Sequence, residues 1–275
     1  MIRRPSAVET ATSLPAFFVL LFVVAVPFWV VGAFTGHLPG VPMRLPVSAL
    51  MFPGPLLVAV FLLRRRESGA TRLLLRRAFA PRRLAHPAWL TATFLLVPGI
   101  ALLGYALDRA MGGASSQGLD VSILAVPPLF ALFFAAAVAE EAGWTGFALD
   151  PLRARWGDLG AALVLGVVWG SWHLVPLVQA GRTPGWIAWW ALGTVGARLV
   201  MVRLYVATGG SVLSAVLLHT MLNLTQSLLP GYTADTSLIA AVAVVTAITG
   251  VLSFLWPRRA GRAVGRPPRP SVTRS

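Results

Sequence analysis

The chain has 275 residues, of which 57% are hydrophobic and 12% are charged, and its mean hydropathy is +0.77. A soluble domain has about 45–50% apolar and about 25% charged residues, so this composition excludes an ordinary soluble core and indicates a polytopic membrane protein. The absence of cysteine excludes disulfides, thiolate metal sites and a cysteine nucleophile.

Apolar runs long enough to cross about 30 Å of hydrocarbon recur along the chain. The first follows two arginines as a secretory signal would, but it is too long and no small-residue cleavage site clearly ends it, so we expect a retained helix. No internal repeat is visible, and we expect residues 1–257 to form a single membrane-embedded domain. The sequence predicts an all-α, polytopic bundle of about eight transmembrane helices, near residues 14–34, 47–63, 88–107, 123–148, 159–178, 184–206, 211–229 and 238–256.

The net charge is +14, and every basic Lys/Arg position is an arginine. In a membrane protein such residues gather in cytoplasmic loops. If the N-terminus is inside, twenty arginines fall in cytoplasmic segments and adjoining helix ends, and only Arg44, Arg109 and Arg182 fall outside. We therefore expect both termini in the cytoplasm, attraction to anionic membrane lipid and no nucleic-acid partner. The exclusive use of arginine suggests a GC-rich bacterial genome, and hence a bacterial cell membrane.

Two basic segments are expected to lie outside the spans. Residues 71–84 alternate leucine, alanine and phenylalanine with arginine, which is typical of a helix lying at the membrane interface. The tail 258–275 is rich in arginine, proline and glycine, and this composition predicts a basic, disordered cytoplasmic segment.

Glu140 and Glu141 lie side by side near the end of the apolar run 123–148. Charged side chains inside a membrane usually face the bundle interior or a water-filled cavity, and they mark a pathway or a reaction. Neighbouring residues of a helix point about a quarter turn apart. We therefore expect one carboxylate to face a reacting centre and the other to face the scaffold.

The other intramembrane polar residues are few. His219 and Asn223 are one turn apart on one side of their helix, and His173 follows Trp169 by one turn. A carboxylate, two imidazoles and an amide that converge from three helices suit the hydrolysis of an amide. The carboxylate would activate a water as general base, and imidazole and amide donors would stabilise the oxyanion.

These residues carry a family resemblance. Residues 140–149 resemble the first motif of the CAAX protease and bacteriocin-processing (CPBP) family, which has two glutamates, three variable residues, Arg, Gly and an aromatic residue. The pair Trp169 and His173 resembles the second motif, and the pair His219 and Asn223 resembles the third. The resemblance covers about residues 123–229, and three motifs in register are specific.

The resemblance implies an eight-helix intramembrane endopeptidase of the glutamate-dependent kind. Glu140 would activate water, His173 would assist it, and His219 with Asn223 would form the oxyanion site. The implied partner is a peptide or protein substrate in or at the membrane. In members of eukaryotic type this is a prenylated protein tail, and in bacterial members the role is peptide maturation, bacteriocin self-immunity or unknown.

One residue departs from the first motif: Thr145 stands where the family has the arginine that pairs with the second glutamate. An unpaired buried carboxylate is costly, so we expect Arg198 to supply the missing cation to Glu141 from a neighbouring helix. Trp144 and Trp169 are expected to support the site, with Trp144 walling a water cavity that opens toward the cytoplasmic half.

Other interpretations remain open from the sequence. A proton-coupled transporter could relay protons through Glu140, His173 and His219, and the loss of the motif arginine at position 145 also fits a catalytically idle membrane scaffold. We expect no cofactor. Zinc is disfavoured because no His-Glu-x-x-His occurs and only one suitably placed carboxylate lies between the two histidines. The default assignment for a further set of tryptophans is the membrane interface: Trp172, Trp186, Trp189 and Trp190.

Overall fold

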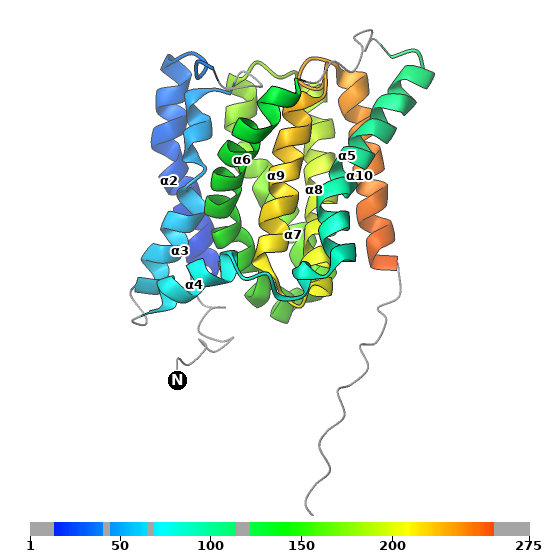
Figure 1. Cartoon of the computed structure of the whole chain (residues 1–275). Helices are drawn as coiled ribbons and strands as arrows, with labels where there is room; N and C mark the ends of the chain where they lie inside the picture. Colours follow the sequence, from blue (N-terminus) through cyan, green and yellow to red (C-terminus); the bar gives the residue numbers. More distant parts are fainter. Residues whose placement is uncertain (1–13, 41–44, 65–68, 114–121, 256–275) are drawn as a thin grey trace, which may run out of the picture.

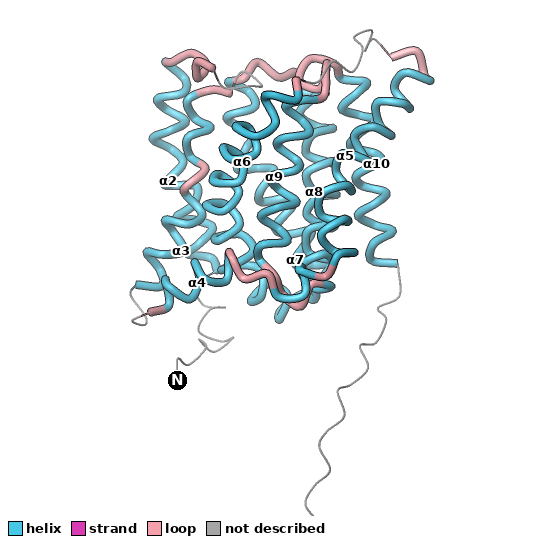
Figure 2. The backbone as a smooth tube through the Cα atoms, viewed as in Figure 1, coloured by secondary structure: helices cyan, strands magenta, loops and turns pink. Residues whose placement is uncertain are grey.

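The computed structural model describes residues 14–40, 45–64, 69–113 and 122–255, without the side chains of residues 82 and 83. These residues form helices almost throughout (Figure 2), and the extended pairing found among them is an isolated bridge between His37 and Pro46. The helices are α2 (Leu14–Phe34), η2 (Val47–Met51), α3 (Gly54–Arg64), α4 (Ala70–Ala78), η3 (Arg82–Ala85), α5 (Pro87–Ala110), η4 (Ile123–Ala125), α6 (Val126–Glu141), the π-helix η5 (Ala142–Ala148), α7 (Leu149–Gln179), α8 (Pro184–Ala207), α9 (Val212–Leu228) and α10 (Thr236–Leu255).

Six helical stretches of the described chain are long and apolar enough to cross a membrane. One of them, residues 123–179, contains 57 residues. Within it Gly157 has φ 67° and ψ −178°, a conformation that residues with a side chain almost never adopt. The chain reverses there, so that α6 and the part of α7 after Gly157 run in opposite directions (Figure 1). This stretch is long enough to cross the membrane twice, and the shorter apolar helix α9 adds one more crossing to the other five stretches. The described chain therefore has about eight crossings, as the sequence predicts.

The two ends of the bundle are formed by different segments (Figure 1). One end, here called the α4 face, carries α4, η3 and the turn 208–211, together with the start of α2 and the end of α10. The opposite end, here called the far face, carries residues 35–40 and 45–46 and the turns 180–183 and 229–235. The described chain therefore begins and ends on one side, while the cytoplasmic location of that side stays a prediction. Arg3, Arg4 and the tail 258–275 lie outside the described residues.

The outer surface of the bundle is apolar along the helices. A contiguous apolar exterior is unfavourable in water and stable in lipid, and helices satisfy their own backbone hydrogen bonds there. The chain is thus an integral membrane protein. The large apolar side chains exposed on this surface include Val23, Val30, Leu95, Leu103, Val167 and Val251.

Close helix contacts hold the interior together. The most extensive pair is α8 with α10, where small residues let the backbones approach. A Cβ added at Gly196 would lie 2.8 Å from the backbone of Ala247, and one added at Gly250 would lie 2.7 Å from the carbonyl oxygen of Gly196. On α8, Arg198 points toward α6 and α7, where its partners Glu141 and Trp169 lie.

Candidate active site

The first motif lies where an α-helix changes into a π-helix. α6 ends at Glu141, and the seven residues of η5 that follow are all buried. π-helical turns are rare and frequent at functional sites. Gly143 makes this segment fit, because a Cβ there would lie 2.4 Å from the carbonyl oxygen of Pro55 in α3. The segment that carries the motif is therefore held against α3 with no room for a side chain.

Glu141 is fully buried, and its carboxylate is surrounded by donors from three helical segments. The guanidinium of Arg198 donates to both of its oxygens, at 2.9 and 3.2 Å. The hydroxyl of Thr145 also donates to it, and Nδ1 of His219 lies 3.0 Å from Oε1. The ion pair that the sequence predicted between Glu141 and Arg198 is present, and it joins the end of α6 to α8.

Trp169 connects this buried carboxylate to the other one. Its indole N–H donates to Oε2 of Glu140 at 3.0 Å. The guanidinium carbon of Arg198 lies 4.3 Å from the centre of the same indole ring, a cation–π contact. One aromatic side chain thus holds the carboxylate of Glu140 and covers the cation that neutralises Glu141.

Both histidines use Nδ1 for contacts within the protein. Nδ1 of His173 lies 2.9 Å from the carbonyl oxygen of Trp169, and Nδ1 of His219 faces the carboxylate of Glu141. Because carbonyl and carboxylate oxygens only accept, Nδ1 carries the hydrogen in each ring. Nε2 is then the nitrogen left to contact a bound molecule, and it is a base in the neutral ring and a donor in the protonated ring.

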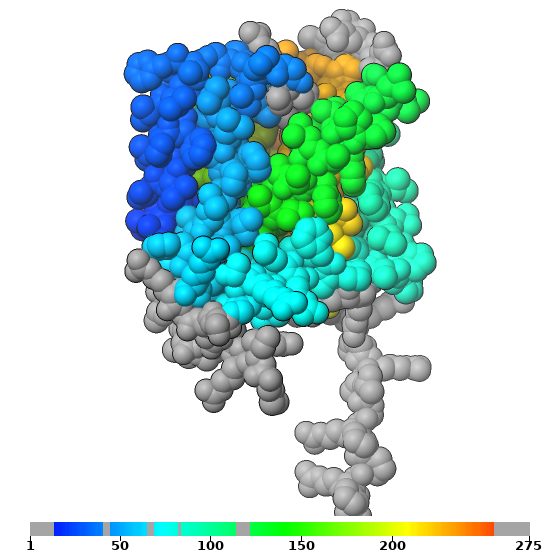
Figure 3. Space-filling view, turned by 60° about the vertical axis from the view of Figure 1, so that its left-hand side comes forward, coloured from blue at the N-terminus to red at the C-terminus, as the bar shows by residue number. Residues whose placement is uncertain are grey.

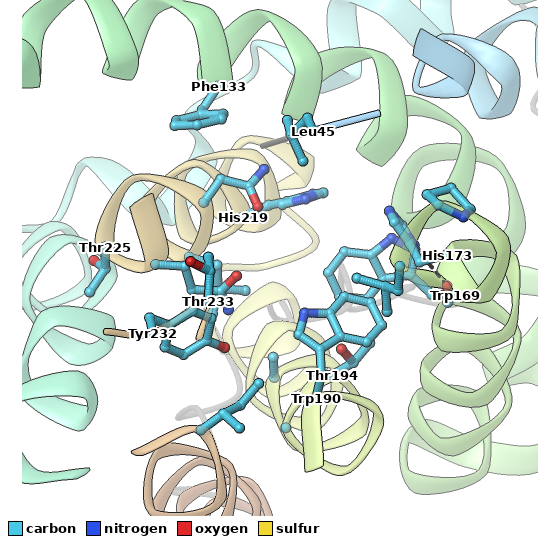
Figure 4. A pocket seen from close by; sticks show the side chains of 18 of the residues that line it. Leu45, Phe133, Trp169, His173, Trp190, Thr194, His219, Thr225, Tyr232 and Thr233 are labelled. Carbon is cyan, nitrogen blue, oxygen red and sulfur yellow. Dashed lines mark hydrogen bonds between the residues drawn. The ribbon is translucent and has the colours of Figure 1, made fainter. Parts of the chain in front are cut away.

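A cavity of about 280 Å³ brings the predicted residues together (Figure 4). Glu140, Trp169, His173, His219 and Asn223 all line it. Figure 4 shows His219, Trp169 and His173 on the wall of this cavity; the ring of Trp169 contacts the rings of both histidines edge-on, with centroids 4.9 Å from His219 and 5.6 Å from His173. No direct hydrogen bond joins Glu140 to either histidine in the described chain, so a water or a substrate atom could contact both kinds of group.

Several tryptophans are placed differently from the expectation. Trp144 is fully buried and does not line the cavity, because η5 turns it against Phe17 and Trp172. The prediction that Trp144 walls the cavity is therefore wrong. Conversely, four tryptophans assigned to the membrane interface all line the cavity, two of them buried: Trp172, Trp186, Trp189 and Trp190.

The lining of the cavity extends toward one end of the bundle. Its polar depth lies between α6, α7 and α9, and its wall continues to Leu38, Leu45, Arg182 and Thr233 of the far face. None of the described residues of the α4 face lines it. The sequence analysis expects the cavity to open toward the cytoplasmic half, and this stays a prediction because the side of the membrane on which each face lies is not shown.

A second polar cluster, not anticipated from the sequence, fastens α4 to the motif. Arg77 donates to the carbonyl oxygen of Gly146 at 3.1 Å, to Asp150 at 2.8 Å and to the hydroxyl of Tyr205 at 3.0 Å. Burial by itself lowers the pKa of Arg77, but Tyr205 and Asp150 outweigh it and raise the pKa above its ordinary value. The clue in the sequence is an acid directly after the motif.

The side chains of the site that the structure describes do not form a set of ligands for a metal ion. Among the described residues, no three side chains of His, Cys, Asp or Glu are placed to hold one ion. Glu141 already accepts from an arginine, a threonine and a histidine. The expectation that the protein uses no metal stays a prediction.

Two comparisons with known proteins agree with the motifs. Residues 122–225 match the family model described as type II CAAX prenyl endopeptidase Rce1-like. A protein of Methanococcus maripaludis named CAAX prenyl protease 2 is 27% identical over 240 residues, which cover 81% of this chain and 87% of that protein. The matched region contains the two glutamates, both histidines of the cavity, and Asn223.

Proposed function

We propose, from the premise that this chain belongs to the CAAX protease and bacteriocin-processing family and is a membrane-embedded protease, that Glu140 activates the water that attacks the peptide bond. The observation that carries this proposal is the different placement of the two glutamates. Glu140 lies on the cavity wall and accepts one hydrogen bond, from Trp169. Glu141 is buried behind it and accepts from three side chains.

The proposed reaction begins with the carboxylate of Glu140 taking a proton from a water in the cavity. The oxygen of that water bonds to the carbonyl carbon, and the carbonyl electron pair moves to its oxygen. Asn223 and the protonated ring of His219 donate to this oxyanion, and the carboxylate of Glu141 beside Nδ1 stabilises that protonated ring. The C–N bond then breaks, and the proton held by Glu140 passes to the leaving amine with the assistance of His173.

The cavity supports a substrate with an apolar, membrane-associated segment. Its walls are mainly leucine, valine, alanine and tryptophan side chains, and few polar groups interrupt them. Such a lining favours apolar side chains or a lipid group over a charged peptide. We propose a membrane-associated peptide, such as a lipidated or bacteriocin-like one, as the substrate class.

The test compares wild type with Glu140→Gln in detergent, against a library of lipidated and unlipidated apolar peptides. Loss of a positioned base lowers the rate by about 10²–10⁴-fold, and we expect a loss of that size for every peptide that is cleaved. The matched control is Asp235→Asn, another change of carboxylate to amide, whose side chain caps α10 outside the cavity. Equal cleavage by wild type and Glu140→Gln would remove Glu140 from the reaction.

A further inference from the structure

The short helix α4 lies along the edge of the α4 face, where Figure 3 shows its surface in cyan. One side of it, which includes Leu74 and Ala78, is buried against the bundle. Successive residues turn by about 100° around a helix axis, so the exposed residues share about a third of its circumference. These exposed residues are Arg72, Leu75, Arg76 and the following Phe79. The helix therefore presents one mixed side, basic and apolar, to its surroundings.

The exposed side of α4 has the composition of a helix that lies at a membrane surface. Phe79 lies beside Phe134 of α6, with ring centroids 6.5 Å apart, and Leu75 lies one turn before Phe79. Arg72 and Arg76 are also one turn apart, and within the described chain neither guanidinium has a hydrogen-bond or ion-pair partner. Apolar residues beside arginines bind the hydrocarbon and the anionic headgroups of a bilayer together. The pattern favours a lipid phosphate over a free phosphate ion, which offers nothing to the apolar pair.

The opposite side of α4 holds the first motif. Arg77 donates to the carbonyl oxygen of Gly146 in η5 and to Asp150 in the first turn of α7. Leu74 packs on the same glycine, since a Cβ added at Gly146 would lie 2.9 Å from Cδ1 of Leu74. A π-helix is a rare conformation, and irregular backbone at membrane depth is tolerated where protein buries it. Displacement of α4 would remove the donor from Gly146 and uncover the segment that carries the motif.

The chain just after α4 also holds the helix of the third motif. The hydroxyl of Ser211 donates to the carbonyl oxygen of Ala80 at 2.9 Å. Ser211 directly precedes α9, and His219 lies about two turns further along that helix. The segment formed by α4 and Ala80 therefore contacts both parts of the chain that bring Glu140 and His219 to the cavity. A shift of this segment would be transmitted to the site by these contacts.

We propose that α4 is a binding site for anionic lipid that regulates the protease. Headgroup phosphates bound by Arg72 and Arg76 hold α4 against η5, and this keeps Glu140 in its position on the cavity wall. A ligand shifts an equilibrium only if it binds one arrangement better than the other. The docked arrangement meets this condition, because Phe79 then continues the lipid-facing surface of α6 and the arginines reach the headgroups beside it. This inference rests on the proposed function and adds the regulation of the same site.

The test measures cleavage of an uncharged apolar peptide in nanodiscs of phosphatidylcholine, or of equal parts phosphatidylcholine and phosphatidylglycerol. An arginine near an anionic surface contributes about fivefold in affinity, and we expect the anionic lipid to raise the kcat of wild type by about fivefold or more. Arg76→Gln should reduce this increase, and Arg72→Gln/Arg76→Gln should abolish it. Arg155→Gln is the matched control and should keep the increase. It removes one exposed arginine from the start of α7, which the ion pair of Asp150 with Arg77 places beside α4.

Binding is measured separately from cleavage, as the phosphatidylglycerol that the detergent-solubilised protein retains in native mass spectrometry. Wild type and Arg155→Gln should retain more than Arg72→Gln/Arg76→Gln. Arg77→Met should retain the lipid without the increase in kcat, because the contact with Gly146 is lost. Glycerol phosphate, the headgroup without acyl chains, should not raise kcat.

Four results overturn the proposal. The first is activation of Arg72→Gln/Arg76→Gln as strong as that of wild type. The second is an equal loss of activation in Arg155→Gln and Arg76→Gln, since the effect would then be one of general surface charge. The third is full activation of Arg77→Met, and the fourth is activation by glycerol phosphate equal to that by the lipid.

Lipid retention does not require catalysis, so the two proposals fail separately. Retention is also measured for Glu140→Gln, which should bind as wild type does. If the anionic lipid raises kcat as expected while Glu140→Gln cleaves like wild type, the regulation stands and the proposed base is wrong. If Glu140→Gln is inactive while wild type has the same kcat in both nanodiscs, the base stands and the regulation is wrong.

Discussion

Arg198 occupies the place in this site that an arginine four residues after Glu141 has in the resembling motif. The substitution by Thr145 keeps a donor on the carboxylate but supplies no charge, and the charge comes from α8 instead. The change therefore relocates the ion pair from within one helix to between two. An idle scaffold, which the loss of the motif arginine suggested, has less support once Glu141 has a cation.

We predict that Arg198→Ala destabilises the protein by about 3–5 kcal/mol, because it leaves a buried carboxylate without its cation. We also predict that Thr145→Arg in the Arg198→Ala background recovers most of the stability and part of the activity, because residue 145 lies one turn from Glu141. Thermal unfolding in detergent and peptide cleavage measure the two effects. A double variant no more stable than Arg198→Ala would contradict the proposed exchange.

At the level of residues, the sequence predicted which side chains lie together at the site, but it did not predict which of them hydrogen-bond to each other. Helical spacing places Glu140, His173, His219 and Asn223 on inward faces, and the structure puts all four on one cavity. Spacing does not identify partners on other helices. It therefore could not show that His219 contacts Glu141 rather than Glu140, or that Trp169 donates to Glu140.

At the level of elements, hydropathy predicted the spans well because it measures what lipid requires. Hydropathy could not predict the π-helix η5, because η5 depends on how closely it packs against α3 and α4. It could not predict the reversal at Gly157 either, because that depends on the backbone conformation of one residue. The span expected at 47–63 is likewise divided into η2 and α3 around Pro53. Irregular backbone of this kind is tolerated where protein buries it.

The motif glycines test whether η5 needs its tight packing. We predict that Gly143→Ala destabilises the protein by about 1–3 kcal/mol, because the new Cβ would overlap the backbone of α3. Gly170→Ala is the matched control, since its Cβ would meet nothing nearer than 4.0 Å. Alanine there should be neutral or stabilise the helix by about 0.5–1 kcal/mol.

Measuring both the unfolding temperature and kcat of the two glycine variants separates a loss of stability from a loss of activity at the site. Because Gly143 lies three residues from Glu140, we expect Gly143→Ala to lower kcat as well as stability, while Gly170→Ala keeps kcat. If the two variants behave alike, the contact between η5 and α3 does not position the first motif.

For the whole molecule, the transporter interpretation can be judged from which ends of the bundle the cavity reaches. The cavity reaches the far face, while none of the described residues of the α4 face lines it. On that side Arg77 ties α4 to the carbonyl oxygen of Gly146 and to Asp150. A proton relay through the membrane would need a polar path across this closed end, and its opening would break several of these contacts.

We therefore predict that liposomes carrying wild-type protein take up protons under an imposed membrane potential no faster than liposomes carrying Glu140→Gln. The physical reason is that Glu140 contacts the cavity on one side and buried groups on the other. A proton on Glu140 can therefore exchange only with the compartment that the cavity reaches. A pH-sensitive dye trapped in the liposomes measures the uptake, and a protonophore added at the end shows that the potential was present. Uptake that is faster for wild type and is lost in Glu140→Gln would support a proton-coupled transporter. The same liposomes, given an apolar peptide on the outside, should then show no cleavage.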